Sequence, residues 1–235
     1  MITSRATVKD MPTHRKISLT AGILYLLTFV SIPTLALYSS VKGADYIIGS
    51  GSDTAALLGG FLELIVALAG IGTAVVLFAI LKKQNETLAI GLIASRILEA
   101  SSIFIGVAVI LTIVSMKQSG VGSEALVISQ ALANLYDRIF LVSQSLLPGV
   151  NDLLLGFLLY QSRLVPRALS LIGIIGGPIL IAGFIAVLFG LIEIDSSLKG
   201  LSAVGVALFE LSLGVWLVVK GFNSKAVASL EKKTQ

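Results

Sequence analysis

Five ionisable side chains interrupt long apolar stretches of this chain, and they are the residues best suited to chemistry. They are Glu63, Arg96, Glu99, Asp152 and Glu210. An uncompensated charge inside a membrane costs several kcal/mol. The carboxyl groups in excess of the single guanidinium must therefore be protonated, hydrogen-bonded or bound to a cation. The pattern predicts either a buried acidic site that binds a ligand, proton or cation, or a network of charges that holds helices together.

The positions of these residues along the chain place most of them at a similar depth. Arg96 and Glu99 are three residues apart and can pair on one face of a helix. At 1.5 Å per residue, the pair lies roughly 15–24 Å from the nearest basic span end, and Asp152 and Glu210 fall in the same layer. Glu63 lies nearer the other side. The candidate ligand- or ion-binding residues are Arg96, Glu99, Asn151, Asp152 and Glu210, with Glu63, Asp137, Arg138 and Gln144 as secondary candidates.

The longest apolar stretch, residues 125–160, also carries a polar stripe. On an uninterrupted helix the stripe falls within an arc of roughly 140° and needs partner helices to cover it. Its members are Asn134, Asp137, Arg138, Gln144, Ser145, Asn151 and Asp152. The stretch exceeds the length that crosses a hydrocarbon core of about 30 Å, so we expect it to tilt, project or break, with a kink at Pro148-Gly149.

The elements that position these side chains follow from hydropathy. Of the 235 residues, 56% are hydrophobic and 13% are charged, whereas soluble proteins carry about 25% charged residues. Apolar runs of about 20 residues predict an all-α integral membrane protein, a six-transmembrane-helix bundle in a single polytopic domain, residues 1–235. The predicted spans are residues 17–38, 54–81, 87–116, 125–160, 168–191 and 198–222, with a second weak point at Gly176-Gly177-Pro178.

Basic residues are distributed unevenly between the ends of these spans. Of the 17 Lys and Arg residues, twelve lie at one set of ends, including Arg5 and Lys9, and three lie in the opposite loops. The positive-inside rule then predicts that both the N and C termini are cytoplasmic. The first span could instead be a signal peptide, but its apolar part is longer than a usual signal core, so we expect it to be retained.

Aromatic side chains lie mostly near the predicted span ends. Tyr25, Tyr38, Tyr46, Tyr136 and Trp216 belong to this group. Such residues commonly sit at the membrane–water interface. We therefore expect them to be interfacial anchors, with ligand stacking by Trp216 as the alternative.

The residue inventory excludes several kinds of chemistry. The chain has no cysteine, and His14 is its one histidine. Thiol nucleophiles, iron–sulfur clusters and histidine-rich zinc sites are therefore excluded. We expect no cofactor, no metal, no catalytic residue and no nucleic-acid partner. Membrane lipids and a small-molecule or ion ligand are the expected partners, and protein partners are unknown.

Several segments are similar to one bacterial membrane family. Residues 151–178, NDLLLGFLLYQSRLVPRALSLIGIIGGP, and residues 209–222, FELSLGVWLVVKGF, resemble domain of unknown function 4386 (DUF4386), as do SRILEA at residues 95–100 and KISLTAGILYLLTFV at residues 16–30. The resemblance implies a polytopic protein of the bacterial cytoplasmic (inner) membrane, without an established activity. The family motifs contain Arg96, Glu99, Asn151, Asp152, Arg163, Pro166, Arg167 and Glu210.

Three functions are compatible with these observations. The first is a non-enzymatic membrane protein whose buried acidic site binds or moves a small ligand, lipid, proton or cation. There Arg96 anchors an anionic group or holds Glu99, and Asp152 and Glu210 titrate or contact the ligand. The second is a structural or regulatory subunit of a membrane complex, whose charges clamp the second, third, fourth and sixth spans together. The third is an intramembrane enzyme that acts on lipid.

Overall fold

The computed structural model describes residues 11–49 and 51–233, and these residues form helices and no strand. In chain order the helices are α1 (Thr13–Thr28), η2 (Phe29–Ser31), α2 (Thr34–Leu37), α3 (Asp53–Leu81), α4 (Glu86–Gln118), η3 (Gly122–Ala125), α5 (Leu126–Leu141), η4 (Val142–Leu146), α6 (Leu147–Ser162), α7 (Arg167–Leu188), α8 (Ser197–Ser202), α9 (Val204–Val219) and α10 (Ser224–Lys233). Within these described ranges, six helical stretches are long and apolar enough to cross a membrane, which confirms the predicted count.

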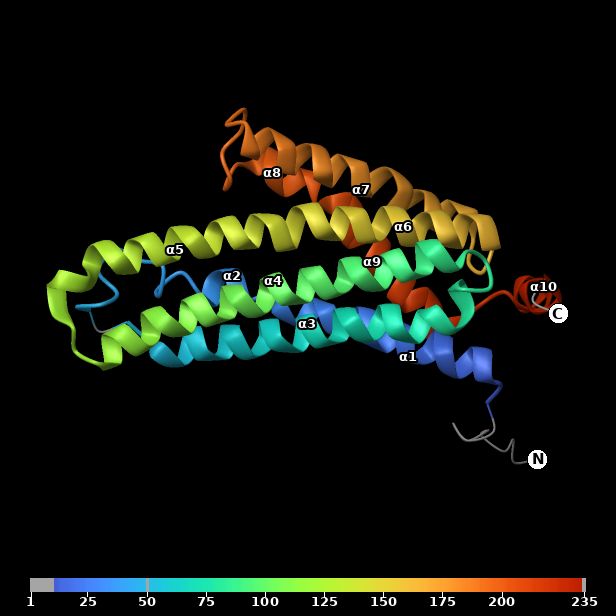
Figure 1. Cartoon of the computed structure of the whole chain (residues 1–235), viewed down its shortest axis with the longest axis horizontal. Helices are drawn as coiled ribbons and strands as arrows, with labels where there is room; N and C mark the ends of the chain where they lie inside the picture. The colour runs from blue at the N-terminus through green and yellow to red at the C-terminus, as the bar shows by residue number, and fades with distance from the viewer. Residues whose placement is uncertain (1–10, 50, 234–235) are drawn as a thin grey trace.

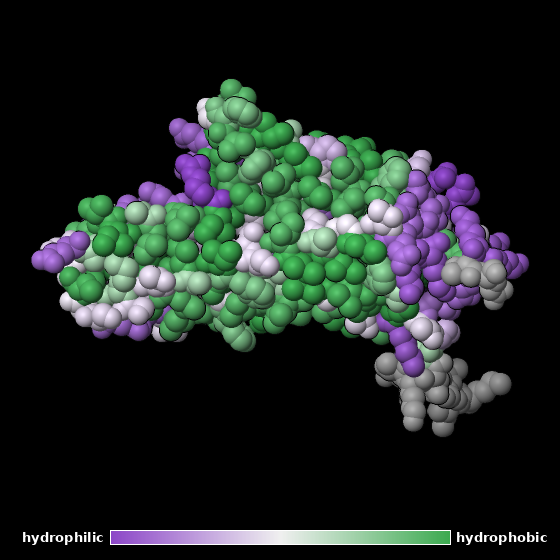
Figure 2. All heavy atoms as spheres, in the orientation of Figure 1, coloured by the Kyte–Doolittle hydropathy of each residue, from purple (hydrophilic) through white to green (hydrophobic). Residues whose placement is uncertain are grey.

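The long helices run side by side along the longest axis of an elongated bundle (Figure 1). α3 packs on α1 and α4, α4 packs on α5 and α6, and α7 packs on α6 and α9. The beginning of α1 and the whole of α10 lie at the same end (Figure 1). A broad hydrophobic zone separates this hydrophilic end from smaller polar areas at the other end (Figure 2). Arg5 and Lys9, counted above among the basic residues, lie outside the described residues.

The first span is interrupted. α1 ends at Thr28, and the chain passes through the 3₁₀ turn η2 before α2 begins at Thr34. Pro33 explains the break, because proline has no backbone N–H to donate to a carbonyl in the preceding turn. The interruption leaves Ile32 with 67% of its surface exposed. Despite the break, Thr13–Leu37 is long and apolar enough to cross a membrane, in agreement with the span predicted at residues 17–38.

The fourth span is interrupted one turn earlier than expected. Residues 142–146 form the π-helical turn η4, and Pro148 lies in the first turn of α6. A π turn inserts an extra residue and rotates everything that follows. The stripe consequently does not form one covered face: Asn134 and Arg138 are exposed, whereas Asn151 and Asp152 are buried.

Glycines bring the helices of the second half close together. A Cβ atom on Gly177 of α7 would lie 2.5 Å from the carbonyl oxygen of Gly149 on α6. A Cβ on Gly205 of α9 would lie 2.8 Å from Cα of Gly176. Small residues allow this approach, which is a usual way for membrane helices to associate. α7 continues through Pro178, so the weak point expected there is not a break.

Polar contacts close both ends of the bundle. At the basic end, Arg15 donates to the carbonyl oxygens of Leu217 (2.8 Å) and Val218 (2.5 Å), near the last turn of α9. At the opposite end, Lys117 pairs with Asp53 at 2.9 Å, and the Tyr46 hydroxyl donates to the same carboxylate at 2.6 Å. Burial and this hydrogen bond raise the pKa of the Tyr46 phenol. Tyr46 is 3% exposed, so it is not the interfacial anchor that was expected.

Candidate binding site

Arg96 is the centre of a buried polar cluster. Its Nη1 donates to Glu99 Oε2 at 2.8 Å, and this confirms the predicted pair one turn apart on α4. Its Nη2 donates to Glu210 Oε1 on α9 at 2.6 Å and to the hydroxyl of Tyr25 on α1 at 3.4 Å. The guanidinium therefore links three helices. It lies ten residues after Glu86, the first residue of α4, which corresponds to roughly 15 Å at 1.5 Å per residue.

Asn151 and Asp152 bring α6 to the same cluster. Asn151 donates to Glu99 Oε2 at 2.7 Å, so this oxygen accepts from both Arg96 and Asn151. Asp152 is fully buried and interacts electrostatically with Arg96, Glu99 and Glu210. In the part of the chain that the structure describes, neither carboxylate oxygen of Asp152 has a hydrogen-bond partner. A buried carboxylate without donors is costly.

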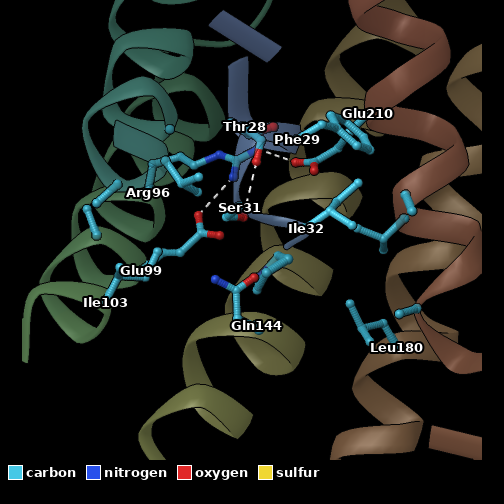
Figure 3. A pocket seen from close by; sticks show the side chains of 18 residues that line it. Thr28, Phe29, Ser31, Ile32, Arg96, Glu99, Ile103, Gln144, Leu180 and Glu210 are labelled. Atoms are coloured by element: carbon cyan, nitrogen blue, oxygen red, sulfur yellow. Dashed lines mark hydrogen bonds and ion pairs between the residues drawn. The ribbon is translucent and has the colours of Figure 1, made fainter. Parts of the chain in front are cut away.

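A cavity of about 190 Å³ lies beside the cluster, between the broken first span and helices α3, α4, α6, α7 and α9 (Figure 3). Its polar lining comprises Thr28, Ser31, Arg96, Glu99, Gln144 and Glu210, and its apolar lining includes Phe29, Ile32, Ile103 and Leu180. Gln144 comes from the π turn, and its amide points toward Glu99 (Figure 3). The cavity extends to the surface of the bundle at the exposed Ile32.

One carboxylate oxygen of Glu99 and one of Glu210 are left for an occupant of the cavity. The bonded atoms are Glu99 Oε2 and Glu210 Oε1. For the other oxygen of each residue, the described part of the chain supplies no hydrogen-bond donor, and neither atom is fully enclosed. With Arg96 and Asp152, the cluster holds three carboxylates and one guanidinium.

Glu63 belongs to a different cluster. It accepts a 2.7 Å hydrogen bond from the Tyr136 hydroxyl and a 3.1 Å bond from the Tyr38 hydroxyl. The two rings meet edge to face, with centroids 5.2 Å apart. Gly59 makes room for Tyr38, because a Cβ there would lie 2.5 Å from the ring. Glu63 therefore joins the second span to the fourth through Tyr136, but it does not reach the cluster of Arg96, where Tyr25 supplies a contact from the first span.

The tyrosines were assigned incorrectly from the sequence. Tyr25, Tyr38 and Tyr136 are each at most 3% exposed, so they are buried partners of charged groups and not interfacial anchors. Composition near a span end does not distinguish the two roles. The sequence signal for buried tyrosines is the presence of acidic residues within the spans. A buried carboxylate needs hydrogen-bond donors, and a tyrosine hydroxyl can supply one without adding charge.

The remaining secondary candidates lie away from the cavity. Asp137 pairs with Lys42 and is partly exposed. Arg138 lines a separate surface pocket with Glu193 and Asp195. Of the nine predicted site residues, the structure therefore gathers Arg96, Glu99, Gln144, Asn151, Asp152 and Glu210 in one region and leaves out Glu63, Asp137 and Arg138. Their functional roles stay predictions.

Across residues 11–49 and 51–233, no group of three or more His, Cys, Asp or Glu side chains is arranged to hold a metal ion. Comparison with known proteins adds one relationship: the family model described as Domain of unknown function (DUF4386) matches residues 20–221. No curated protein and no solved structure matches the chain.

Proposed function

The chain belongs to the DUF4386 family, and we propose that it is a polytopic membrane protein that binds and moves a small monovalent cation through the cavity beside Arg96. The observation that carries this proposal is the ratio of charges: two buried carboxylates, of Glu99 and Asp152, and the partly buried carboxylate of Glu210 lie around one guanidinium. Ionised, the cluster lacks two positive charges. A bound cation or protons would supply them, because charges in such an interior must be neutralised.

The geometry argues against an anionic ligand. Both terminal nitrogens of Arg96 already donate to carboxylates, and its Nε atom is buried without a partner in the described residues. Of the two roles considered for Arg96, holding Glu99 is therefore better supported than anchoring an anion. The free oxygens beside the cavity belong to Glu99 and Glu210, and these attract positive charge.

The size and lining of the cavity narrow the class of cation. About 190 Å³ accommodates a hydrated alkali ion or a small organic ammonium ion. The polar side offers carboxylate, amide and hydroxyl oxygens, whereas Phe29 and Ile32 provide an apolar side next to the surface. Protonation of a buried carboxylate would release the cation, since neutralising the acid removes the attraction. Cation movement is therefore expected to be coupled to proton movement.

Transport can be tested in sealed proteoliposomes that contain the pH dye pyranine. An imposed gradient of Na⁺, K⁺ or tetramethylammonium, a cation without a membrane-permeant neutral form, should change the internal pH in vesicles with the wild-type protein and leave it unchanged with Glu210→Gln. The matched control is Glu124→Gln, which removes an acid outside the cavity. If none of the three gradients moves protons, or if Glu210→Gln transports as the wild type does, the proposal is wrong.

A structural clamp is the second candidate function. The observation in its favour is that the cluster joins α1, α4, α6 and α9 through Tyr25, Arg96, Asn151 and Glu210. Under this alternative, Asp152→Asn and Glu210→Gln would lower the unfolding temperature, and no cation would change it in any variant. Stability and cation response therefore separate the two functions.

We also infer the location of the protein from its charges. The cations at the end shared by α1 and α10 fit the cytoplasmic face of a bacterial inner membrane. On this assignment the cluster lies roughly 15 Å from the cytoplasmic end of α4, near the middle of the membrane. Alkaline phosphatase fused to the C-terminus should be inactive in a bacterial host, and an active fusion would reverse the orientation.

A further inference from the structure

At the basic end of the bundle, a second cavity has a different chemical character. It measures about 520 Å³ and is formed by the loop between α6 and α7 and the loop between α9 and α10. Arg163, Arg167 and Lys220 line it. None of the described residues around it is acidic, and none of these three cations forms an ion pair within the described ranges. The cavity therefore combines three positive charges without a counter-charge.

The backbone of this region is held in place. The amide of Asn223 donates to the carbonyl oxygen of Leu164 at 2.9 Å and so joins the two loops. The Trp216 indole donates to the carbonyl oxygen of Gly221 at 3.1 Å. The guanidinium of Arg167 lies 4.7 Å from the centre of the Tyr160 ring. Arg167 therefore projects from a fixed backbone beside the Tyr160 phenol, and the Trp216 indole lines the same cavity.

Arg163 occupies an unusual backbone conformation. It ends α6 with φ of 57°, the one positive φ among the described residues other than glycine. Glycine normally fills this position because an L side chain is strained there. An arginine kept at a strained position indicates that its side chain has a role. The N-terminus of α7 begins four residues later and has no side-chain cap, so its free N–H groups also favour an anion.

An apolar groove continues from this basic cavity along the outside of the bundle. It measures about 410 Å³, runs between α7 and α9, and includes Leu208, Leu211 and Val215. Trp216 and Lys220 line both the groove and the cavity, so the two are contiguous. The surface formed by the cavity and the groove is therefore cationic at the basic end of the bundle and apolar toward the middle of the bundle.

We propose that these two cavities form one binding site for an anionic phospholipid, whose phosphate lies among Arg163, Arg167 and Lys220 and whose acyl chain lies along the α7–α9 groove. Charge complementarity selects the lipid class, since a phosphodiester is anionic and guanidinium groups bind it through several parallel N–H donors. The apolar extension selects a lipid over free phosphate. This site is separate from the cavity beside Arg96 and does not depend on the function proposed there.

Native mass spectrometry of the detergent-purified protein tests the site, with phosphatidylglycerol and phosphatidylcholine of identical acyl chains as probes. The wild type should retain phosphatidylglycerol preferentially. The triple variant Arg163→Gly, Arg167→Gln, Lys220→Gln should lose roughly a hundredfold in apparent affinity. The control Lys225→Gln, Lys232→Gln, Lys233→Gln removes the same charge at the same end and should retain the lipid. Equal retention of both lipids, or equal loss in both variants, would overturn the proposal.

Two further arms separate a lipid site from a phosphate site. Val215→Trp fills the groove at an exposed position and should abolish retention of phosphatidylglycerol. Glycerol phosphate at the same concentration should not displace the lipid. Retention in Val215→Trp, or full displacement by glycerol phosphate, would exclude the acyl-chain assignment. If the triple variant does not fold, Arg163→Gly alone suffices, because glycine suits its backbone, and it should weaken binding by roughly fivefold.

Discussion

Arg96 Nη2 lies 2.6 Å from Glu210 Oε1 and joins α4 to α9, although these two helices are not among the closely packed pairs of the bundle. Both side chains line the cavity beside them. The bond therefore crosses an opening instead of reinforcing a packed helix interface. A cation that competes for Glu210 would weaken the one polar connection between α4 and α9 in the described structure. Cation binding in the cavity would then change the position of α4 relative to α9.

The charge ratio predicts that the base matters more for stability than the acid. Arg96→Gln leaves the buried carboxylates of Glu99 and Asp152 and the partly buried carboxylate of Glu210 without a cation, and it should lower the free energy of unfolding by about 3–5 kcal/mol. Glu210→Gln keeps the Arg96–Glu99 pair and should cost less than about 2 kcal/mol. Thermal unfolding in detergent compares the two variants directly. An equal loss in both would mean that the acids are not in excess.

Adjacent residues on α6 give a matched pair of substitutions. Asp152→Asn removes a carboxyl group whose oxygens have no hydrogen-bond partner in the described structure, so the unfolding temperature should stay the same or rise. Asn151→Asp replaces the hydrogen-bond donor to Glu99 with a further carboxylate. This substitution should lower the unfolding temperature, with a loss of about 1–3 kcal/mol in the free energy of unfolding. A clear loss of stability in Asp152→Asn would favour the clamp.

The tyrosine pair at Glu63 should contribute to stability but not to cation binding. Tyr136→Phe removes the 2.7 Å bond and Tyr38→Phe removes the 3.1 Å bond, and each leaves a buried carboxylate oxygen without its donor. Each substitution should cost about 1–3 kcal/mol, with the larger loss for Tyr136→Phe. Unfolding measurements test the cost. If either variant abolishes the response to cations, the two clusters are coupled and the separation drawn here is wrong.

Hydropathy predicted the six spans because membrane burial depends on local composition, and the predicted boundaries lie within a few residues of the helices. It also predicted the Arg96–Glu99 pair, which depends only on helix periodicity. The break in the first span has a sequence signal in Pro33, which has no backbone N–H to continue the helix. Pro148 signalled an irregularity in the fourth span, but not its form, a π turn over residues 142–146, because an inserted residue is stabilised by the packing of other helices. The role of Tyr25 likewise depends on contacts with residues far away in the sequence.

Close packing between α6 and α7 leaves no room for a side chain at Gly177. Gly177→Ala places a Cβ against the Gly149 carbonyl and should cost at least about 1–3 kcal/mol. Gly91→Ala, within α4, meets only an ordinary contact with Leu154 and should stabilise the protein by up to about 1 kcal/mol. Unfolding temperatures of the two variants should therefore move in opposite directions. Equal shifts would contradict the described interface.

The proposed cation site is tested most directly by cation-dependent stability. The unfolding temperature of the purified protein is measured against Na⁺, K⁺ and methylammonium, with ionic strength held constant by a bulky reference cation. Because a ligand that binds the folded state stabilises it, at least one small cation should raise the wild-type temperature in a saturable manner, and the shift should disappear in Glu210→Gln. No saturable shift with any of the three, or the same shift in Glu210→Gln, would contradict a cation site beside Arg96.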